Sequence, residues 1–597
     1  MNNNFSRRNK SYNMENVNIK INGREYSVPK DSTILEACRA ASIEVPTLCY
    51  MKDMNEIGAC RICLVDVKGA RGMMAACVQP ITPNMEILTN TPAVQNARKI
   101  NLELILSEHN KDCLSCIRNQ NCELQKMCKD FAVDDENYFA GTKIEYPIEQ
   151  STIFLVRDNN KCIKCRRCVA TCQKMQGISV IGMNDRGFDT HVGCAFEENL
   201  GNVPCISCGQ CIVSCPTGAL YEKDDMGKAW AAISDPDKHV VVCTSPSIRA
   251  TLGECFHLEP GTFVGGKMVA ALKRLGFDGV YDMDMTADLT VMEEANEFIE
   301  RVQGGGKLPI ITSCSPGWVK YCEHYFPEFL ENLSSCKSPQ QMFGAIYKSY
   351  YAEKLGLDPK NIVVVSIIPC TAKKFEITRE GQSANGEDIR DVDVALTTRE
   401  LGRMITRAGI NFSMLPDEDF DSPIATASGA GHIFGTSGGV MEAALRTAAE
   451  TILNKPLEKI DFAEVRGIEG IKKASYKLGD LEVKVAVASG TANAKKLLNA
   501  VKKGEIDVHF IEIMACPGGC INGGGQPVQP MNVRNFTDLK TARSKALYEI
   551  DKNMTLRKAH ENPIIKELYS EYLEKPGSEK AHHLLHTHYK KRGMYTK

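Results

Sequence analysis

Cysteine is the residue type that most restricts the chemistry of this chain. The 597 residues contain 26 cysteines, and most of them fall into five groups with short, regular spacing. Thiolates that lie two residues apart are poor disulfide partners and good ligands for iron–sulfur clusters. The spacing therefore predicts a series of redox clusters, and it favours a reducing cytoplasm over secretion.

The clearest pattern is a run of the form C-x2-C-x2-C-x3-C that occurs twice. The first run consists of Cys162, Cys165, Cys168 and Cys172, and the second of Cys205, Cys208, Cys211 and Cys215. In bacterial two-cluster ferredoxins the fourth cysteine of each run binds the cluster of the other run. We therefore predict two [4Fe-4S] clusters, one held by Cys162, Cys165, Cys168 and Cys215, the other by Cys205, Cys208, Cys211 and Cys172.

Two further groups precede these runs. Residues 17–28 alternate apolar and polar around Asn22-Gly23, a hairpin signal, and Asp31 or Ser32 is expected to cap a helix that ends near Ala41. The cysteines that follow are Cys49, Cys60, Cys63 and Cys77. Hairpin, helix and cysteine loop resemble the β-grasp of a plant-type [2Fe-2S] ferredoxin, although the first gap is ten residues instead of four. A four-cysteine zinc site is the alternative.

The second of these groups is H-x3-C-x2-C-x5-C, formed by His109, Cys113, Cys116 and Cys122 at the end of an amphipathic helical segment. One imidazole and three thiolates suit either zinc or an iron–sulfur cluster. Because a redox-inactive ion would interrupt a chain of clusters, we predict a [4Fe-4S] cluster with one histidine ligand.

The second half of the chain has a different pattern. Apolar, strand-like runs alternate with amphipathic helices, which predicts α/β layers with largely parallel sheets. These runs are HVVVCTS, LPIITSC, NIVVVSIIPC, VDVALTT and KVAVASG. Several end in polar or cysteine-containing loops, and ligands gather at the carboxyl ends of strands in such sheets. The loops at 245–247, 312–314 and 369–370 are therefore expected to converge on one site.

Three segments of this half resemble the signature motifs of the [FeFe]-hydrogenases. They are TSCSPGW at 312–318, PCTAKKFE at 369–376 and EIMACPGGCINGGGQ at 512–526. With the four upstream cluster sites in this order, the chain is similar to the large clostridial monomeric form of that family from about residue 17 to the end. The closing segment, after residue 550, looks like the family's small subunit fused in cis.

The resemblance implies an H-cluster, in which a cubane is joined through one thiolate to a two-iron unit with CO, cyanide and azadithiolate. Its cubane ligands would be Cys370, Cys516, Cys520 and the residue at position 315, with Cys520 as the bridge. Hydrogen bonds to cyanide or nearby groups would come from Lys373, Ser247, Gln340 and the backbone around Pro246 and Gly435. Met514 and Phe434 would pack around the cluster.

Position 315 departs from the family pattern, which usually reads TSCCPxW where this chain has Cys314-Ser315. In a straight alignment Cys314 is the proton-relay thiol and Ser315 replaces a thiolate ligand by a harder, more basic alkoxide donor. In the alternative alignment the loop slides by one residue and Cys314 becomes the ligand. The sequence leaves both open.

A proton route is also implied by the resemblance. It runs through Cys314, Glu294, Ser334 and Glu297, with a water near Cys314. The two glutamates are three residues apart in VMEEANEFIE, so they are expected on one face of a helix.

These features predict a multidomain protein: a β-grasp [2Fe-2S] domain, a His/Cys3 [4Fe-4S] domain, a domain with two [4Fe-4S] clusters like a bacterial ferredoxin, and an α/β catalytic domain. The expected boundaries are a polar tail at 1–16, then 17–95, 96–145, 146–225 and 226–550, with the small-subunit-like segment at 551–597.

Composition limits the partners. The formal net charge is −2, so there is no basic bias towards nucleic acid, and no stretch approaches the roughly 20 apolar residues of a membrane span. A nicotinamide-binding GxGxxG after a strand is absent. The expected function is therefore a cytoplasmic, oxygen-sensitive ferredoxin hydrogenase that reversibly reduces protons to H2, with ferredoxin or flavodoxin as electron carrier and maturation proteins supplying the H-cluster.

Three alternatives stay open at this point. One is an H2-sensing relative with slow turnover, which the altered TSCSP loop allows. Another is an electron-relay subunit similar to the iron–sulfur subunit of respiratory complex I. The third is the catalytic subunit of a bifurcating complex with flavin-containing partners.

Overall fold

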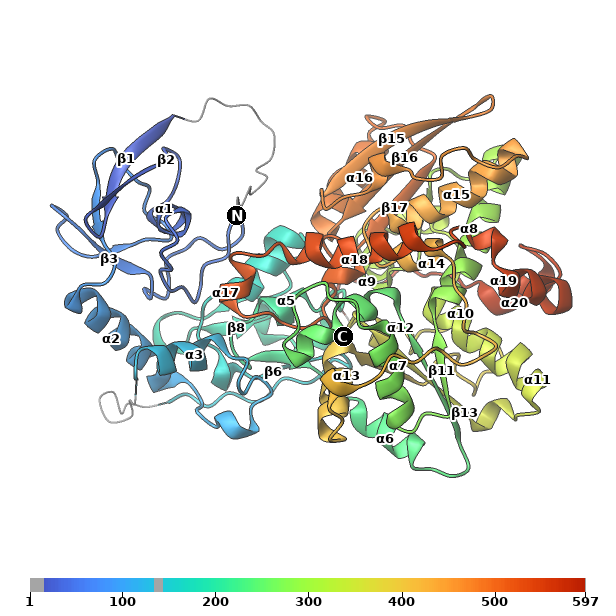
Figure 1. Ribbon diagram of the computed structural model, residues 1–597, viewed down its shortest axis with the longest axis horizontal. Helices are drawn as coiled ribbons and strands as arrows, with labels where there is room; N and C mark the ends of the chain where they lie inside the picture. The colour runs from blue at the N-terminus through green and yellow to red at the C-terminus, as the bar shows by residue number, and fades with distance from the viewer. Residues whose placement is uncertain (1–14, 134–142, 596–597) are drawn as a thin grey trace.

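The computed structural model describes residues 15–133 and 143–595 (Figure 1). Most of the polar tail expected at 1–16, and residues 134–142 of the His/Cys3 segment, lie outside the described residues. The amino-terminal cluster-binding segments lie on one side of the molecule in Figure 1, and the α/β layers on the other.

The first segment is a five-stranded sheet with one helix. Strands β1 (Asn16–Ile21) and β2 (Arg24–Pro29) form the predicted hairpin, and β3 (Leu64–Val67), β4 (Met74–Ala75) and β5 (Glu86–Leu88) complete the order β2-β1-β5-β3-β4. Helix α1 (Ile34–Ala40) begins after Thr33, whose side chain accepts from the amide of Glu36 while the Glu36 carboxylate accepts from Thr33. The expectation that Asp31 or Ser32 caps this helix was therefore wrong, because the reciprocal capping box is available only at Thr33.

The cluster segments that follow are short elements joined by loops. Helices α2 (Pro92–Glu108) and α3 (Glu123–Asp130) flank the His/Cys3 loop. The next unit contains two short helices, α4 (Arg167–Ala170) and α5 (Gln210–Ser214). It also contains two antiparallel strand pairs: β6 (Leu155–Arg157) with β9 (Leu220–Glu222), and β7 (Gly182–Asn184) with β8 (His191–Gly193).

Two four-stranded sheets form the remaining core. One has the order β11 (Gly279–Asp282), β10 (His239–Thr244), β13 (Ile362–Ile368), β14 (Val394–Thr397), with all neighbours parallel. The other has the order β12 (Ile310–Ile311), β17 (Phe510–Met514), β16 (Leu481–Ser489), β15 (Ile471–Leu478), in which only β15 is antiparallel. All five predicted apolar runs contain strands, and the prediction of largely parallel sheets is confirmed.

Helix α8 (Asp284–Gly304) joins the two sheets. Leu289 packs in the apolar core of the first sheet, and Ala295 and Phe298 pack in that of the second. The other helices that cover these sheets are α6 (Met226–Ile233), α7 (Gly265–Arg274), α9 (Pro316–Tyr325), α10 (Pro339–Ile346), α11 (Ala352–Leu355), α12 (Lys373–Glu376), α13 (Thr398–Arg407), α14 (Gly429–Ile433), α15 (Gly439–Leu453), α16 (Thr491–Lys502), α17 (Met531–Arg534), α18 (Leu539–Asn553), α19 (Pro563–Leu568) and α20 (Glu579–Leu585). Among the described residues, none of the helices has both the length and the apolar character needed to span a membrane.

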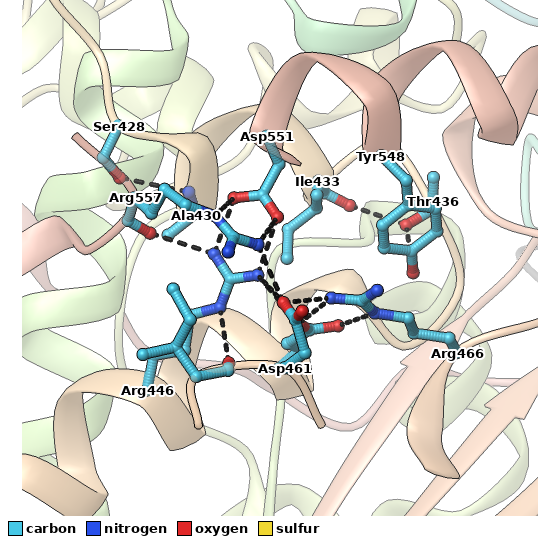
Figure 2. A network of polar contacts seen from close by, with 12 residues as sticks. Ser428, Ala430, Ile433, Thr436, Arg446, Asp461, Arg466, Tyr548, Asp551 and Arg557 are labelled. Carbon is cyan, nitrogen blue, oxygen red and sulfur yellow. Dashed lines mark hydrogen bonds and ion pairs between the residues drawn. The ribbon is translucent and has the colours of Figure 1, made fainter. Parts of the chain in front are cut away.

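A buried ion-pair network fastens the carboxyl-terminal helices to this core (Figure 2). Arg446 on α15 is fully buried and makes two 2.8 Å bonds to the carboxylate of Asp551 on α18 and one to Glu442. Arg557 also contacts the carboxylate of Asp551, and Arg466 contacts that of Glu442. Asp551 also lies against Gly429, where a Cβ atom would approach its Oδ1 to 2.1 Å. The network therefore positions α14 as well as α18.

Replacing Arg446 by methionine should lower the stability of the protein by about 3 kcal/mol. The change removes one guanidinium group from the buried carboxylates of Glu442 and Asp551. Removing one partner of a buried ion pair lowers the free energy of unfolding, because the other charge is left without compensation. The expected result is an earlier urea unfolding transition of the region that includes α18. Lys307→Met, which removes an ion pair between two exposed side chains, is the control and should leave the transition unchanged. Equal transitions for both variants would contradict the role given to Arg446.

Candidate functional site

A cavity lies where strands of both sheets end. The residues singled out in the sequence that line it are Pro246, Cys314, Ser315, Gln340, Cys370, Lys373, Phe434, Gly435, Met514, Cys516 and Cys520. Ser247 does not line it; its hydroxyl accepts a 3.2 Å hydrogen bond from Gln526. Because parallel strands present their carboxyl ends at one edge, loops more than 250 residues apart meet at this cavity.

Of the three cysteines predicted as ligands in this cavity, Cys516 is buried and Cys370 and Cys520 are half-buried. Burial raises the pKa of Cys370, of Cys516 and of Cys520, the last to about 12, so these thiols are protonated unless a metal binds them. Gln210, in the second ferredoxin-like run, donates a 3.2 Å hydrogen bond to the Cys516 sulfur. Buried thiols gathered without a disulfide are the donor set that an iron–sulfur cubane requires, so these residues fit the cluster.

The two residues at the altered position face different surroundings. The Ser315 hydroxyl accepts a 3.2 Å hydrogen bond from the amide of Ala515, the neighbour of Cys516. Cys314 packs in the apolar cluster that includes Val291 and Met514, and burial and then the carboxylate of Glu294 raise its thiol pKa far above the ordinary value. Ser315 therefore lies on the Cys516 side of the cavity and Cys314 on the Glu294 side.

Lys373 is held by a residue that the sequence analysis did not single out. Its ammonium group contacts both oxygens of Glu376, at 2.9 and 3.1 Å. Glu376 also accepts hydrogen bonds from Ser338 and Gln340, and the Gln340 oxygen accepts one from Ser366. The polar atoms of Gln340 are thus committed to protein partners, which makes it a positioning residue for Lys373. The PCTAKKFE motif ends at Glu376, and that was the available signal.

The expected proton-route residues lie together beside Cys314. Glu294 and Glu297 both project from α8, as predicted. Ser334 donates a 2.8 Å hydrogen bond to Glu297, whose other oxygen lies 2.6 Å from Arg301. Neither oxygen of the buried Glu294 carboxyl group has a hydrogen-bond partner among the described residues, an arrangement that disfavours its charged form. Burial, and next the Glu297 carboxylate, raise the pKa of Glu294 to about 8.

Glu294 should therefore carry a proton at pH 7 and lose it near pH 8. The folded protein holds this proton more tightly than the unfolded chain, so the stabilisation is complete below about pH 4.5 and is lost as the pH rises through 8. The measurement is the infrared carbonyl band of a buried carboxylic acid, followed from pH 5 to 10. Glu294→Gln should abolish the band that titrates near pH 8. A band that titrates at the same pH in this variant would contradict the assignment.

The two ferredoxin-like runs form two separate sites. Cys162, Cys165, Cys168 and Cys215 line one cavity, and Cys172, Cys205, Cys208 and Cys211 line another. The structure thus brings the fourth cysteine of each run to the other run's site. Cys208 also lines the cavity that contains Cys516, so the second site adjoins the site between the sheets.

The four cysteines of the first segment lie at the end of the β-grasp. The Cys63 and Cys77 sulfurs are 3.3 Å apart, and a hydrogen bond shared by Cys49 and Cys60 lowers the pKa of Cys60 and raises that of Cys49. The buried amide of Asn55 donates to the carbonyls of Cys49, at 2.7 Å, and of Cys165, at 3.0 Å. This amide therefore joins the first site directly to a ferredoxin-like site, a contact between distant segments that spacing cannot reveal.

His109 is buried next to the same ferredoxin-like unit. Burial lowers its pKa to about 4, and its Nδ1 has no hydrogen-bond partner within the described ranges. A neutral imidazole with a free ring nitrogen is the form that binds metal. The sulfur of Cys116 lies so close to Gly218 that a Cβ there would approach it to 2.5 Å. The His/Cys3 site therefore also borders the site of Cys215.

Four family descriptions match the chain. They are a 2Fe-2S iron-sulfur cluster binding domain (residues 14–92), the NADH-ubiquinone oxidoreductase-G iron-sulfur binding region (98–137), the C-terminal domain of the iron only hydrogenase large subunit (238–524) and the iron hydrogenase small subunit (537–592). The match at 238–524 contains every residue that lines the cavity between the sheets, apart from Cys208.

The chain is similar over its length to two characterised proteins. It is 48% identical to the NADP-reducing hydrogenase subunit HndD of Solidesulfovibrio fructosivorans, over 97% of this chain and 100% of that one. It is 42% identical to iron hydrogenase 1 of Clostridium pasteurianum, over 96% of this chain and 100% of that one. Among solved structures, an apo variant of [FeFe]-hydrogenase HydA1 from Chlamydomonas reinhardtii is 40% identical with a TM-score of 0.55, and covers 62% of this chain and 100% of its own.

Proposed function

The chain belongs to the iron-only hydrogenase family, and on that premise we propose that it catalyses the reversible reduction of protons to H2 with electrons from a soluble carrier. The observation that supports this most directly is that one cavity is reached from two sides. Cys208, from a cluster site, lines one part of it, and Cys314, beside the Glu294 carboxyl group, lines another. Electrons and protons would therefore arrive at the same place.

The cofactors in this proposal are one [2Fe-2S] cluster, three accessory [4Fe-4S] clusters and the H-cluster, installed by maturation proteins. When bound, the H-cluster would supply the open iron position at which H2 forms. Cys370, Cys516, Cys520 and position 315 would hold it, and Lys373, fixed by Glu376, would place a positive charge against its anionic ligands. Phe434 and Met514 would exclude water from the apolar side of the cavity.

The protein's own residues would move protons between the cavity and solvent. Cys314 and Glu294 are both protonated at neutral pH, so each can donate a proton inward and be reloaded from Ser334 and Glu297. Glu297 is the outermost member, with 14% of its side chain exposed. A carboxyl group with a pKa near the working pH transfers protons in both directions with little bias.

The electron route in this proposal is branched. Asn55 links the Cys49 loop to Cys165, and Cys116 lies against the chain near Cys215, so both amino-terminal sites border the same ferredoxin-like site. From there the route would continue through the site of Cys208 to the cavity.

The central test is infrared spectroscopy of anaerobically matured protein, together with H2 production from reduced methyl viologen. The expected result is a set of CO and cyanide bands with fast turnover. The same bands with little turnover would favour an H2 sensor. If correctly matured protein lacked these bands, the proposal would be wrong, and the electron-relay alternative, which the match at 98–137 supports only locally, would replace it.

The carrier is tested on the purified chain alone. We propose ferredoxin or flavodoxin, because the sequence has no nicotinamide-binding fingerprint, and we place the reaction in the cytoplasm, where cysteine ligands stay reduced. A second candidate is a nicotinamide-linked complex with partner subunits, which the similarity to HndD favours. If the purified chain alone produces H2 from reduced ferredoxin, the ferredoxin or flavodoxin proposal is supported. If activity requires co-purified flavin-containing subunits and NADPH, the nicotinamide-linked complex is supported instead.

At position 315 we propose that Ser315 occupies the place of the fourth cubane ligand and that Cys314 is the relay thiol. The support is their placement, Ser315 beside the Cys516 loop and Cys314 beside Glu294. Because an alkoxide stabilises the oxidised cluster more than a thiolate does, Ser315→Cys should raise the midpoint potential of the cubane, measured by redox titration with electron paramagnetic resonance.

Cys314→Ala is the companion variant for this assignment. It should keep the iron content and lose roughly 100-fold or more in turnover, because a positioned proton donor is missing. Loss of cubane iron in Cys314→Ala, with full iron in Ser315→Ala, would instead make Cys314 the ligand.

A further inference from the structure

A fully buried arginine lies where the amino-terminal cluster sites meet. Arg167 stands between Cys165 and Cys168 in the sequence, and none of its surface is exposed. Its Nη1 lies 2.9 and 3.1 Å from the two carboxylate oxygens of Glu123, which follows Cys122 of the His/Cys3 site. The thiolates of Cys165 and of Cys49 are also close enough to act on its charge. Arg167 thus borders three of the sites at once.

Two other arginines surround the same carboxylate. Arg534, on α17, reaches Glu123 with one terminal nitrogen and donates with the other to the carbonyl of Val213 on α5, and Figure 1 shows α17 beside α5. Arg118 donates a 3.3 Å hydrogen bond to the carbonyl of Cys215, and its charge also acts on Glu123. We refer to Arg118, Arg167, Arg534 and Glu123 as the arginine junction.

The arginine junction carries an excess of positive charge. Three guanidinium groups share one carboxylate, and Nε and Nη2 of Arg167 have no hydrogen-bond partner in the part of the chain that is described. A buried cation that lacks an equal negative charge nearby is destabilising. Clusters bound by thiolates are anionic, so bound clusters would supply the missing negative charge, and each added electron would strengthen the attraction.

We propose that the arginine junction is a redox-tuning site that raises the reduction potential of the cluster bound by Cys162, Cys165, Cys168 and Cys215, and so makes it the collector for electrons from both amino-terminal clusters. Each transfer oxidises one amino-terminal cluster by one electron and reduces the collector by one. The inference rests on the proposed function, since it needs the clusters to be present. It adds a role for residues that bind no metal.

The alternative is that the arginine junction only braces the packing of α17 and α3 against the cluster sites. The two roles differ in the sign of their effects. A brace would respond to the loss of any member in the same way, with lower stability and lower iron content. A tuning site responds to charge, so the loss of a cation and the loss of the anion must shift the potential in opposite directions.

The experiment is a redox titration of the anaerobically reconstituted full chain, followed by electron paramagnetic resonance, with iron and sulfide contents measured on the same samples. In Arg167→Met and Arg534→Met, the ratio of reduced to oxidised collector at a fixed potential should fall on the order of tenfold, which is 59 mV for one electron. In Glu123→Gln the ratio should rise. Arg167→Lys should restore most of the wild-type value, because it keeps the charge.

Arg186→Met is the matched control. Arg186 is an exposed arginine of the same cluster-binding unit, so water screens its charge and the titration should not move. Shifts of opposite sign for the cation and anion variants, with full iron content, support the inference. Wild-type titrations in all variants, or shifts of one sign that follow iron loss, overturn it. If the wild-type chain took up no iron or sulfide, the proposed function itself would fail, which separates the two results.

Discussion

Negative charge held away from water is the constraint on which the rest of this structure depends. The candidate ligands are almost all thiols that are buried or half-buried, and burial raises the pKa of those between the sheets, so they stay neutral until metal binds. Once ionised, they need cations and hydrogen-bond donors placed in advance. In the proposed function, Lys373 at the cavity, Gln210 beside Cys516, and the arginines around Glu123 would meet that need from separate parts of the chain.

Each of these compensating groups is itself buried and must in turn be held. Glu376 fixes Lys373, while Ser338 and Gln340 fix Glu376, so a chain of hydrogen bonds extends from the cavity to β13. The same logic applies to the carboxyl-terminal helices. There Arg446 pairs with Asp551, and Asp551 packs against α14, whose following residues Phe434 and Gly435 line the cavity. Stability and site geometry therefore depend on the same buried contacts.

The proton and electron routes differ in what the fold must provide. The proposed proton route needs carboxyl and hydroxyl groups close to one another, and α8 carries two of the proposed members, Glu294 and Glu297. The proposed electron route needs only that cofactors lie close together, so short loops with little regular structure are enough for it. The amino-terminal third accordingly has short strands and, apart from the 17-residue helix α2, short helices, whereas the second half has two sheets whose strand ends direct several loops to one point.

Sequence alone determined the features that are local in the chain. Cysteine runs, the β1–β2 hairpin, the apolar strands and the helical spacing of Glu294 and Glu297 depend on residues a few positions apart, and the structure contains each of these elements. The capping of α1 was misjudged by one or two residues, because neighbouring polar residues compete for that position until the reciprocal partner is known.

Only the tertiary structure decided which distant groups meet. Asn55 with Cys165, Gln340 with Glu376, and Arg534 with Glu123 join segments up to 411 positions apart, and no spacing rule connects them. The sequence likewise did not decide which side of the cavity Cys314 occupies and which side Ser315 occupies. Adjacent residues of one loop can exchange places when the loop shifts by one residue. Hydrogen bonding and burial across the folded chain distinguish them, because these terms depend on partners that the loop itself does not contain.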